Sequence, residues 1–179
     1  YRIRWLEFRR VLFRSRKCEE YALNCDMKCD ICSVSTMIEM KFYQDMKDWG
    51  WNVMFVNGDG QQPAFIYTTG LYFKFKHPEI VISGNTNLAS IVYYLVHEYV
   101  QKGQNLIPNK SYSNIILKYD VIFREVKQTE KSSKFYLLWK YYRTHYSEDP
   151  KIIQLVFPDL SGKFPNEKGY NKNFGQEIF

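Results

Sequence analysis

Four residues in the middle of the sequence carry the side chains that general acid–base chemistry needs. His77 and Glu79 are separated only by Pro78, and Tyr67 and Thr68 lie about ten residues earlier. A histidine beside a carboxylate can act as a general base if the pair is open to solvent and its pKa lies near neutrality. The alternative is a structural one, in which Glu79 holds His77 or a backbone amide and so fixes a turn. Hydrolase-like chemistry is therefore one hypothesis for this stretch.

A cluster of cysteines near the start offers a second kind of chemistry. Cys29 and Cys32 form a C-x2-C pair, the spacing that lets two thiolates bind one zinc ion, with Cys18 and Cys25 preceding them. A structural zinc site needs four ligands, and Cys25 and His77 are the further ligands we consider. The chain contains no second C-x2-C pair. The alternative is a set of free thiols in a reducing cytosol.

The first site requires two short strands to position it, and residues 63–84 have the pattern of such a pair. Residues 64–69 have apolar character on both faces of a strand, and Gly70 predicts that a bulge or a close backbone approach interrupts it there. The run 79–83 is apolar after its first residue, as in a buried inner strand. Pro78 favours an extended backbone at the residue before it, so we expect His77 and Glu79 at the opening of this strand.

The remaining elements predict an α+β fold. We expect a single domain with a mixed, mainly antiparallel sheet of about five or six strands, packed by about three helices. We find no nucleophile elbow, P-loop or dinucleotide fingerprint in the sequence. The expected helices span about 36–49, 86–102 and 132–146. The expected further strands span 51–56, 114–119, 121–127 and 151–157, with one bent strand as the alternative for the runs 114–119 and 121–127.

One polar residue stands out in the last predicted strand. Gln154 lies among apolar residues in the run 151–157. A buried amide that lacks hydrogen-bond partners costs about 1–3 kcal/mol. We therefore expect Gln154 either to pair with nearby backbone or to face a pocket.

Composition and charge narrow the classes of function. The chain has 179 residues, 45% of them hydrophobic, which is enough for one globular domain with a core. The net charge is +6, but residues 1–15 carry +4 of it, which leaves an ordinary +2. This balance argues against a nucleic-acid partner. We find no apolar run long enough to cross a membrane, so we expect a soluble, cytoplasmic protein without a membrane partner.

The first fifteen residues are themselves unusual. Residues 6–15, LEFRRVLFRS, resemble the translation of a common sequencing-adapter oligonucleotide. We therefore interpret residues 1–15 as an adapter-like artefact and exclude them from functional reasoning. The predicted α+β domain then spans residues 16–179.

A series of short motifs resembles the bacterial domain-of-unknown-function family four-two-six-two. The motifs are Cys29-Asp30-Ile31-Cys32, Gly50-Trp51, Pro63, Tyr67-Thr68 with Gly70-Leu71, His77-Pro78-Glu79, Gln154 with Asp159, Gly162, and Phe164-Pro165. The resemblance covers most of residues 29–170, and it implies that Gln154 and Asp159 are neighbours of the central site. Two positions depart from the family pattern: Trp49, where His usually stands, and Asn166, where Trp usually stands. A more distant resemblance links the chain to suppressor-of-fused-like domains, some of which resemble immunity proteins.

These observations leave three hypotheses for function. We favour a small protein- or ligand-binding module, with an immunity or defence-associated protein partner, because no complete catalytic constellation is present. The second hypothesis is a small hydrolase-like enzyme whose residues are Tyr67, Thr68, His77, Glu79, Gln154 and Asp159. The third is a zinc-binding protein that uses Cys25, Cys29 and Cys32, and no other cofactor is expected.

Overall fold

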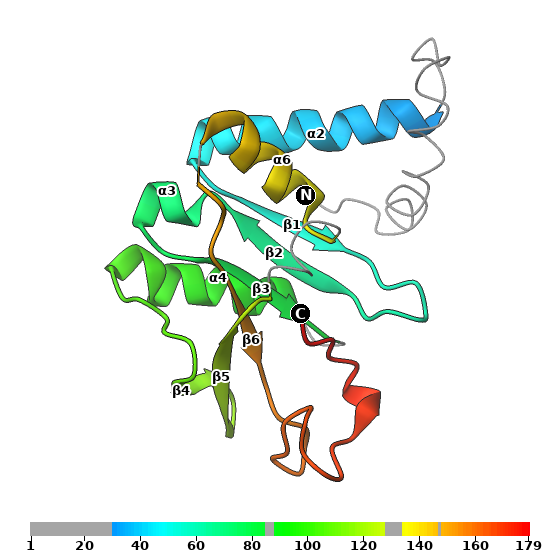
Figure 1. The fold of residues 1–179 in the computed structure, drawn as a ribbon, viewed down its shortest axis with the longest axis vertical. Helices are drawn as coiled ribbons and strands as arrows, with labels where there is room; N and C mark the ends of the chain where they lie inside the picture. The colour runs from blue at the N-terminus through cyan, green and yellow to red at the C-terminus, as the bar shows by residue number, and fades with distance from the viewer. Residues whose placement is uncertain (1–29, 85–87, 128–133, 147) are drawn as a thin grey trace. The chain divides into compact units, whose positions relative to one another are not determined.

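A computed structural model describes residues 30–84, 88–127, 134–146 and 148–179 (Figure 1). Contacts within the chain divide it into two compact units, one ending at Trp49 and one running from Gly50 to Phe179. Residues 1–15, which the sequence marks as adapter-like, lie outside the described residues.

The described part of the first unit is one helix, α2 (Asp30–Trp49). The sequence predicts a helix from about residue 36, so the helix begins about six residues earlier than expected. Gly50, which follows it, adopts a φ of 70°, a left-handed conformation that glycine tolerates and that is common just after a helix.

The second unit is built on one six-stranded sheet with the order β1-β2-β3-β6-β5-β4. β3 and β6 run parallel, and the other four neighbouring pairs are antiparallel. The prediction of an α+β fold with a mixed, mainly antiparallel sheet is confirmed. The strands are β1 (Asn52–Val56), β2 (Phe65–Thr69), β3 (Glu79–Ser83), β4 (Ser111–Ile116), β5 (Tyr119–Glu125) and β6 (Ile152–Val156).

Short helices connect these strands. The α-helices of the second unit are α3 (Leu71–Phe75), α4 (Leu88–Glu98) and α6 (Tyr136–His145), and two 3-10 turns, η2 (Val100–Lys102) and η3 (Lys172–Phe174), complete it. The sequence predicts α4 and α6 with longer bounds, and it predicts α3 only as an aromatic and basic link. The described residues therefore contain four α-helices rather than about three.

The two faces of the sheet differ in polarity. Since side chains alternate along a strand, Ile80 and Ile82 of β3 lie on one face and Glu79 and Ser83 on the other. The first face packs against the apolar side of α4 and forms the main core, with members from every strand in the middle of the sheet. The other face packs against Phe135, at the start of α6, and against Tyr142. This second face is where buried polar side chains gather.

A C-terminal segment completes the second face. After β6 the chain makes a long excursion through η3 and returns, and its last residues lie beside β3 and β6 (Figure 1). Gly84, at the end of β3, has a φ of 141° and no side chain, and a Cβ there would stand 3.4 Å from Gln176 Cγ. Phe157 Cζ would be closer still, at 2.9 Å, so the glycine makes room chiefly for that ring.

Candidate functional site

Glu79 is the centre of the buried polar layer between the sheet and α6. Its Oε1 accepts hydrogen bonds from the Gly70 amide at 2.8 Å, from the Tyr72 amide at 3.3 Å and from the Tyr142 hydroxyl at 2.6 Å. Its Oε2 accepts from the Thr68 hydroxyl at 2.7 Å. The side chain is fully buried. Four donors thus converge on one carboxyl group.

This arrangement explains why a five-residue helix forms at Leu71. Gly70 lies at the N-cap with a φ of 100° and provides no side chain to cap the helix. The Glu79 carboxyl takes over that task, because it accepts the first free amides of the helix. Burial raises the pKa of Glu79, while the hydrogen bonds from Tyr142, Thr68 and the two amides oppose that rise.

His77 lies close to Glu79 in sequence, but it makes its contacts elsewhere. Its Nδ1 lies 2.6 Å from the Pro78 carbonyl oxygen, and its Nε2 accepts a hydrogen bond from the Leu106 amide at 3.1 Å. These contacts fix the neutral tautomer with the proton on Nδ1. Burial lowers the pKa of His77, and the contact with Pro78 opposes this. The imidazole therefore joins two loops in its neutral form.

The side chains of Tyr67 and Thr68 are also buried. Tyr67 is 3% exposed, and its ring packs against Phe65 and Phe135. Burial raises the pKa of the Tyr67 phenol, so it stays protonated. Thr68 donates to Glu79 and accepts from the Ile80 amide at 2.9 Å, which joins β2 to β3 where their ladder ends.

Asp159 lies in a different place, the loop after β6. Its carboxylate accepts the Ser161 amide and hydroxyl, at 2.9 and 2.7 Å, the Lys163 amide at 3.0 Å and the Asn171 amide at 2.7 Å. These bonds, led by the Ser161 hydroxyl, lower the pKa of Asp159 to about 2. Asp159 thus organises the loop that carries the chain back toward the sheet.

The sequence leaves open whether Gln154 pairs with backbone or faces a pocket, and the structure shows that it pairs with backbone. Its Nε2 donates to the Glu177 carbonyl at 2.5 Å, and its Oε1 accepts from the Phe179 amide at 2.9 Å. Ser83, on the neighbouring strand, accepts the Glu177 amide at 3.1 Å. One amide side chain and one hydroxyl therefore bind three main-chain groups of an extended segment.

The side chains of that segment also have defined partners. The Phe179 ring packs edge-to-face against Phe65 and Phe135, with centroids 5.2 and 5.4 Å away. Lys134 forms an ion pair with Glu177 and places its ammonium 5.1 Å from the centre of the Phe179 ring.

In a further contact, a side chain of that segment binds the main chain of the residue that follows β6. The Gln176 side chain donates to the Phe157 carbonyl at 2.6 Å and accepts the Phe157 amide at 3.1 Å. We call the receiving residues the slot, and they are Phe65, Ser83, Lys134, Phe135, Gln154 and Phe157. We call the occupant segment 176–179.

The predicted site residues therefore divide into groups. Tyr67, Glu79 and Gln154 lie on the α6 side of the sheet, and Thr68 reaches Glu79 from the end of β2. His77 contacts the loop at Leu106, and Asp159 organises a separate loop. The residues that the sequence did not suggest are Ser83, Tyr142 and segment 176–179. Segment 176–179 has the sequence Gln-Glu-Ile-Phe, which carries no periodic pattern that would mark it as part of the site.

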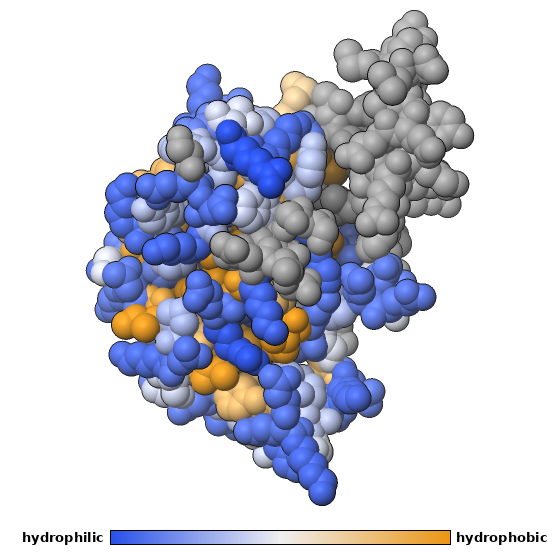
Figure 2. All heavy atoms as spheres, in the orientation of Figure 1, coloured by the Kyte–Doolittle hydropathy of each residue, from blue (hydrophilic) through white to orange (hydrophobic). Residues whose placement is uncertain are grey.

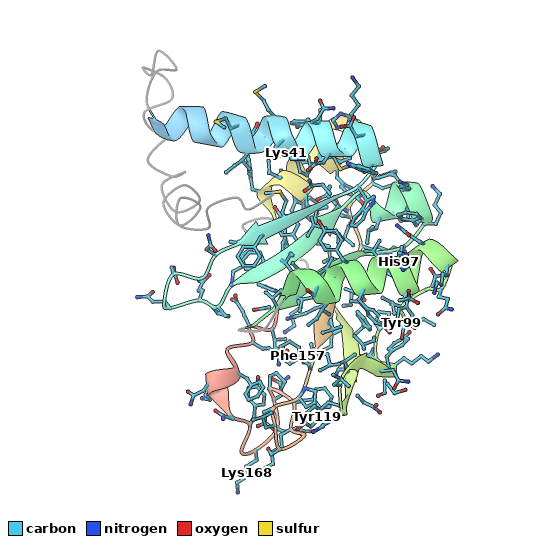
Figure 3. The ribbon with its side chains drawn as sticks, turned by 180° about the vertical axis from the view of Figure 1, so that it is seen from behind. Lys41, His97, Tyr99, Tyr119, Phe157 and Lys168 are labelled. Atoms are coloured by element: carbon cyan, nitrogen blue, oxygen red, sulfur yellow. The ribbon has the colours of Figure 1, made fainter. Side chains whose placement is uncertain are left out.

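An open groove lies elsewhere, on the outer side of α4. It has a volume of about 390 Å³ and is lined by Trp51, Tyr93, Tyr94, Val96, His97, Glu98 and Gln101. The His97 side chain is 72% exposed, and Figure 3 shows it at the end of α4. On the side that carries α6, Figure 2 shows apolar residues gathered in the middle of the face, between polar ones.

The metal hypothesis stays a prediction. Cys25 and Cys29 lie outside the described residues, and Cys32 falls in the first turn of α2. Among the residues that the structure describes, no three His, Cys, Asp or Glu side chains are grouped so that they could hold a metal ion. None of the described helices is long and apolar enough to cross a membrane.

The comparisons with known proteins agree with the motif series. The model of the family "Domain of unknown function (DUF4262)" matches residues 45–171, more than two thirds of the chain. This chain belongs to the DUF4262 family. No curated protein and no solved structure matches it. All six slot residues lie inside the DUF4262 match, and segment 176–179 lies beyond its end. The resemblance to suppressor-of-fused-like domains stays a prediction.

Proposed function

We propose that this DUF4262 domain is a protein-binding module that holds an extended segment of a partner in the slot. The observation that carries the proposal is the pair of hydrogen bonds between the Gln154 amide and the main chain of Glu177 and Phe179. A side-chain amide offers one donor and one acceptor, so it can bind two main-chain groups of any extended peptide. In the structure, segment 176–179 occupies the slot from within the same chain.

The chemistry of the slot favours binding over turnover. Peptide-recognition surfaces take affinity from main-chain hydrogen bonds and specificity from pockets for alternate side chains, and the slot offers both. Glu79, the carboxyl group on this face of the sheet, is fully buried and already accepts four hydrogen bonds. A buried carboxyl with its acceptors in use is better suited to holding the fold than to attacking a substrate.

The extent of the family match gives a second reason. The residues that form the slot belong to the DUF4262 domain, whereas the segment that fills it follows the matched residues. A partner segment with the same contacts could therefore take the place of segment 176–179 without changing the domain. An immunity protein that binds a toxin would be one member of this class of module.

A peptide-binding measurement on the full chain tests the proposal. In an open-slot variant, Glu177→Ala with Phe179→Ala, the internal segment loses its ion pair and its ring contacts. We expect a fluorescein-labelled peptide of residues 171–179 to bind this variant saturably at micromolar concentration in fluorescence anisotropy. We expect the unchanged chain to bind at least about tenfold more weakly, because its own tethered segment competes at an effective concentration on the order of millimolar.

Two further variants make the result specific. Gln154→Leu in the open-slot background removes both main-chain bonds at similar volume, and we expect it to abolish the binding. Tyr93→Ala lies in the groove on α4, away from the slot, and we expect it to leave the binding unchanged. A folded open-slot variant that shows no saturable binding at millimolar peptide would overturn the proposal.

A further inference from the structure

We infer that the slot selects one class of sequence: glutamine, then an acidic residue, then any residue, then an aromatic residue. This inference rests on the proposed function, because it names the ligand class of the same site. It follows from the side-chain contacts of segment 176–179, which are separate from the main-chain bonds of Gln154. Each of the three selective positions has its own partner in the slot.

The spacing of the acidic and aromatic positions matches an extended peptide. Residues two apart in an extended chain point to the same side, and Glu177 and Phe179 both contact Lys134. Ile178 lies between them and is only partly buried. The slot therefore has side-chain partners for the first and third of these residues, and we expect it to tolerate change at the second.

The acidic position depends on Lys134. In the ion pair with Glu177, the Lys134 side chain is 18% exposed and the Glu177 side chain 24% exposed. One carboxylate oxygen of Glu177 contacts the ammonium, and the other is buried without a hydrogen-bond partner among the described residues. A partly desolvated carboxylate with a single cation beside it depends on that cation. The same ammonium lies over the Phe179 ring, so Lys134 contacts two selective positions.

The aromatic position depends on ring geometry. Phe65 and Phe135 meet at an interplanar angle of 86°, and Phe179 meets them at 66° and 71°. Because edge-to-face contact with the Phe65 and Phe135 rings requires a ring, the pocket favours an aromatic side chain at residue 179 over an aliphatic one of similar volume. Phe179 is 3% exposed in this pocket.

The glutamine position depends on the main chain of Phe157. The Gln176 amide makes one donor and one acceptor contact with that residue, at 2.6 and 3.1 Å. Glutamate at this position would lose the donor, and alanine would lose both contacts. This contact fixes the register of the peptide, since it anchors the segment at the end of β6.

A panel of peptides tests the inference on the open-slot variant of the full chain. Relative to the peptide of residues 171–179, we expect Phe179→Ala to weaken binding more than about tenfold. We expect Glu177→Gln to weaken it about fivefold, and Gln176→Ala by a similar factor. We expect Ile178→Ala to change it by less than about twofold.

A protein variant isolates the role of Lys134. Lys134→Met keeps the aliphatic stem and removes the charge. In the open-slot background we expect this change to make the unchanged peptide and its Glu177→Gln form bind equally. The peptide that carries Phe179→Ala should still bind more weakly than the unchanged peptide. Retention of the acidic preference in the Lys134→Met variant would contradict the assignment.

The outcomes separate the inference from the proposed function. Binding of every peptide with equal affinity would leave the proposed function standing and overturn the inference. No binding of any peptide to the folded variant would overturn both. If circular dichroism shows that the open-slot variant is unfolded, the same panel is measured on Phe179→Leu, which keeps most of the buried volume. Equal binding of all peptides and absence of binding are then interpreted in the same way.

Discussion

At the scale of single residues, Glu79 does more than its sequence position suggests. The sequence identifies it as a candidate acid or base beside His77, and it also offers the structural alternative of a turn-fixing carboxylate. The observed contacts match the second description, because Glu79 caps α3 and bonds to Tyr142. Sequence alone could not decide between them, since Tyr142 lies 63 residues away and only the fold brings it to Glu79.

Two substitutions at Glu79 should have different effects. Glu79→Ala removes every acceptor and leaves the Gly70 and Tyr72 amides without partners. We expect a loss of about 2–4 kcal/mol in the free energy of unfolding. Glu79→Gln keeps one oxygen for these amides and can donate to Thr68, so we expect a change within about 1 kcal/mol at neutral pH. Urea denaturation of the two variants checks this, and equal destabilisation by both would contradict it.

A comparison of the unchanged chain with Glu79→Gln reports on the Glu79 charge. Because burial raises the pKa of Glu79 above its ordinary value of 4.5, the folded state binds its proton more tightly than the unfolded state. Its contribution to stability is therefore fully present below pH 4.5 and declines as the pH rises through the raised pKa. We expect the stability of the unchanged chain, measured relative to Glu79→Gln, to fall from pH 4.5 upward. The stability of Glu79→Gln is subtracted from that of the unchanged chain because both contain His77. The lowered pKa of His77 makes stability rise with pH, which opposes the effect of Glu79.

At the scale of elements, the sequence predicts the strands better than the connections. Short, largely apolar runs predict β2, β3 and β6 within a residue or two, because each strand is buried on both faces. It fails at α3, a five-residue helix with no side-chain cap of its own. Local propensity could not indicate this helix, since a carboxyl group from the following strand caps it. The start of β4 is likewise shifted, with Asn114 at a φ of 67° in an irregular stretch of its pairing.

A glycine at the end of β3 tests how tightly the Phe157 ring packs over that strand end. In Gly84→Ala, the new Cβ would stand 2.9 Å from Phe157 Cζ and 3.4 Å from Gln176 Cγ, at a φ of 141°. Gly103→Ala is a control for a positive φ without crowding, because its φ of 73° lies near the αL region that side chains can adopt and no atom lies within 4 Å of the new Cβ. We expect Gly103→Ala to cost about 1 kcal/mol and Gly84→Ala to cost at least about 1–2 kcal/mol more. Equal losses in urea denaturation would show that neither the φ of 141° nor the Phe157 ring restricts residue 84.

At the scale of the whole molecule, the family match and the segment that packs against it occupy different parts of the chain. The DUF4262 match contains the slot, and the internal ligand follows it. The sequence predicts the family and the buried Gln154, and it leaves two kinds of partner open for that amide. It could not name Glu177 and Phe179 as the partners, because a return of the chain after a long loop has no periodic signal. Asp159 provides part of that return by organising the loop.

Thermal unfolding distinguishes an internal ligand from an ordinary part of the core. A ligand that binds only the folded state stabilises it by about 2.7 kcal/mol at a concentration of 100 times its Kd. For a chain of this size, that free energy corresponds to a rise in Tm of about 5–10 °C. We therefore expect the peptide of residues 171–179 to raise the Tm of the open-slot variant by this amount. It should leave the unchanged chain within about 1 °C, because segment 176–179 already fills the slot. An equal rise in both proteins would mean that the peptide binds at another surface. No rise in either, with the variant folded, would mean that the slot accepts only its own tethered segment.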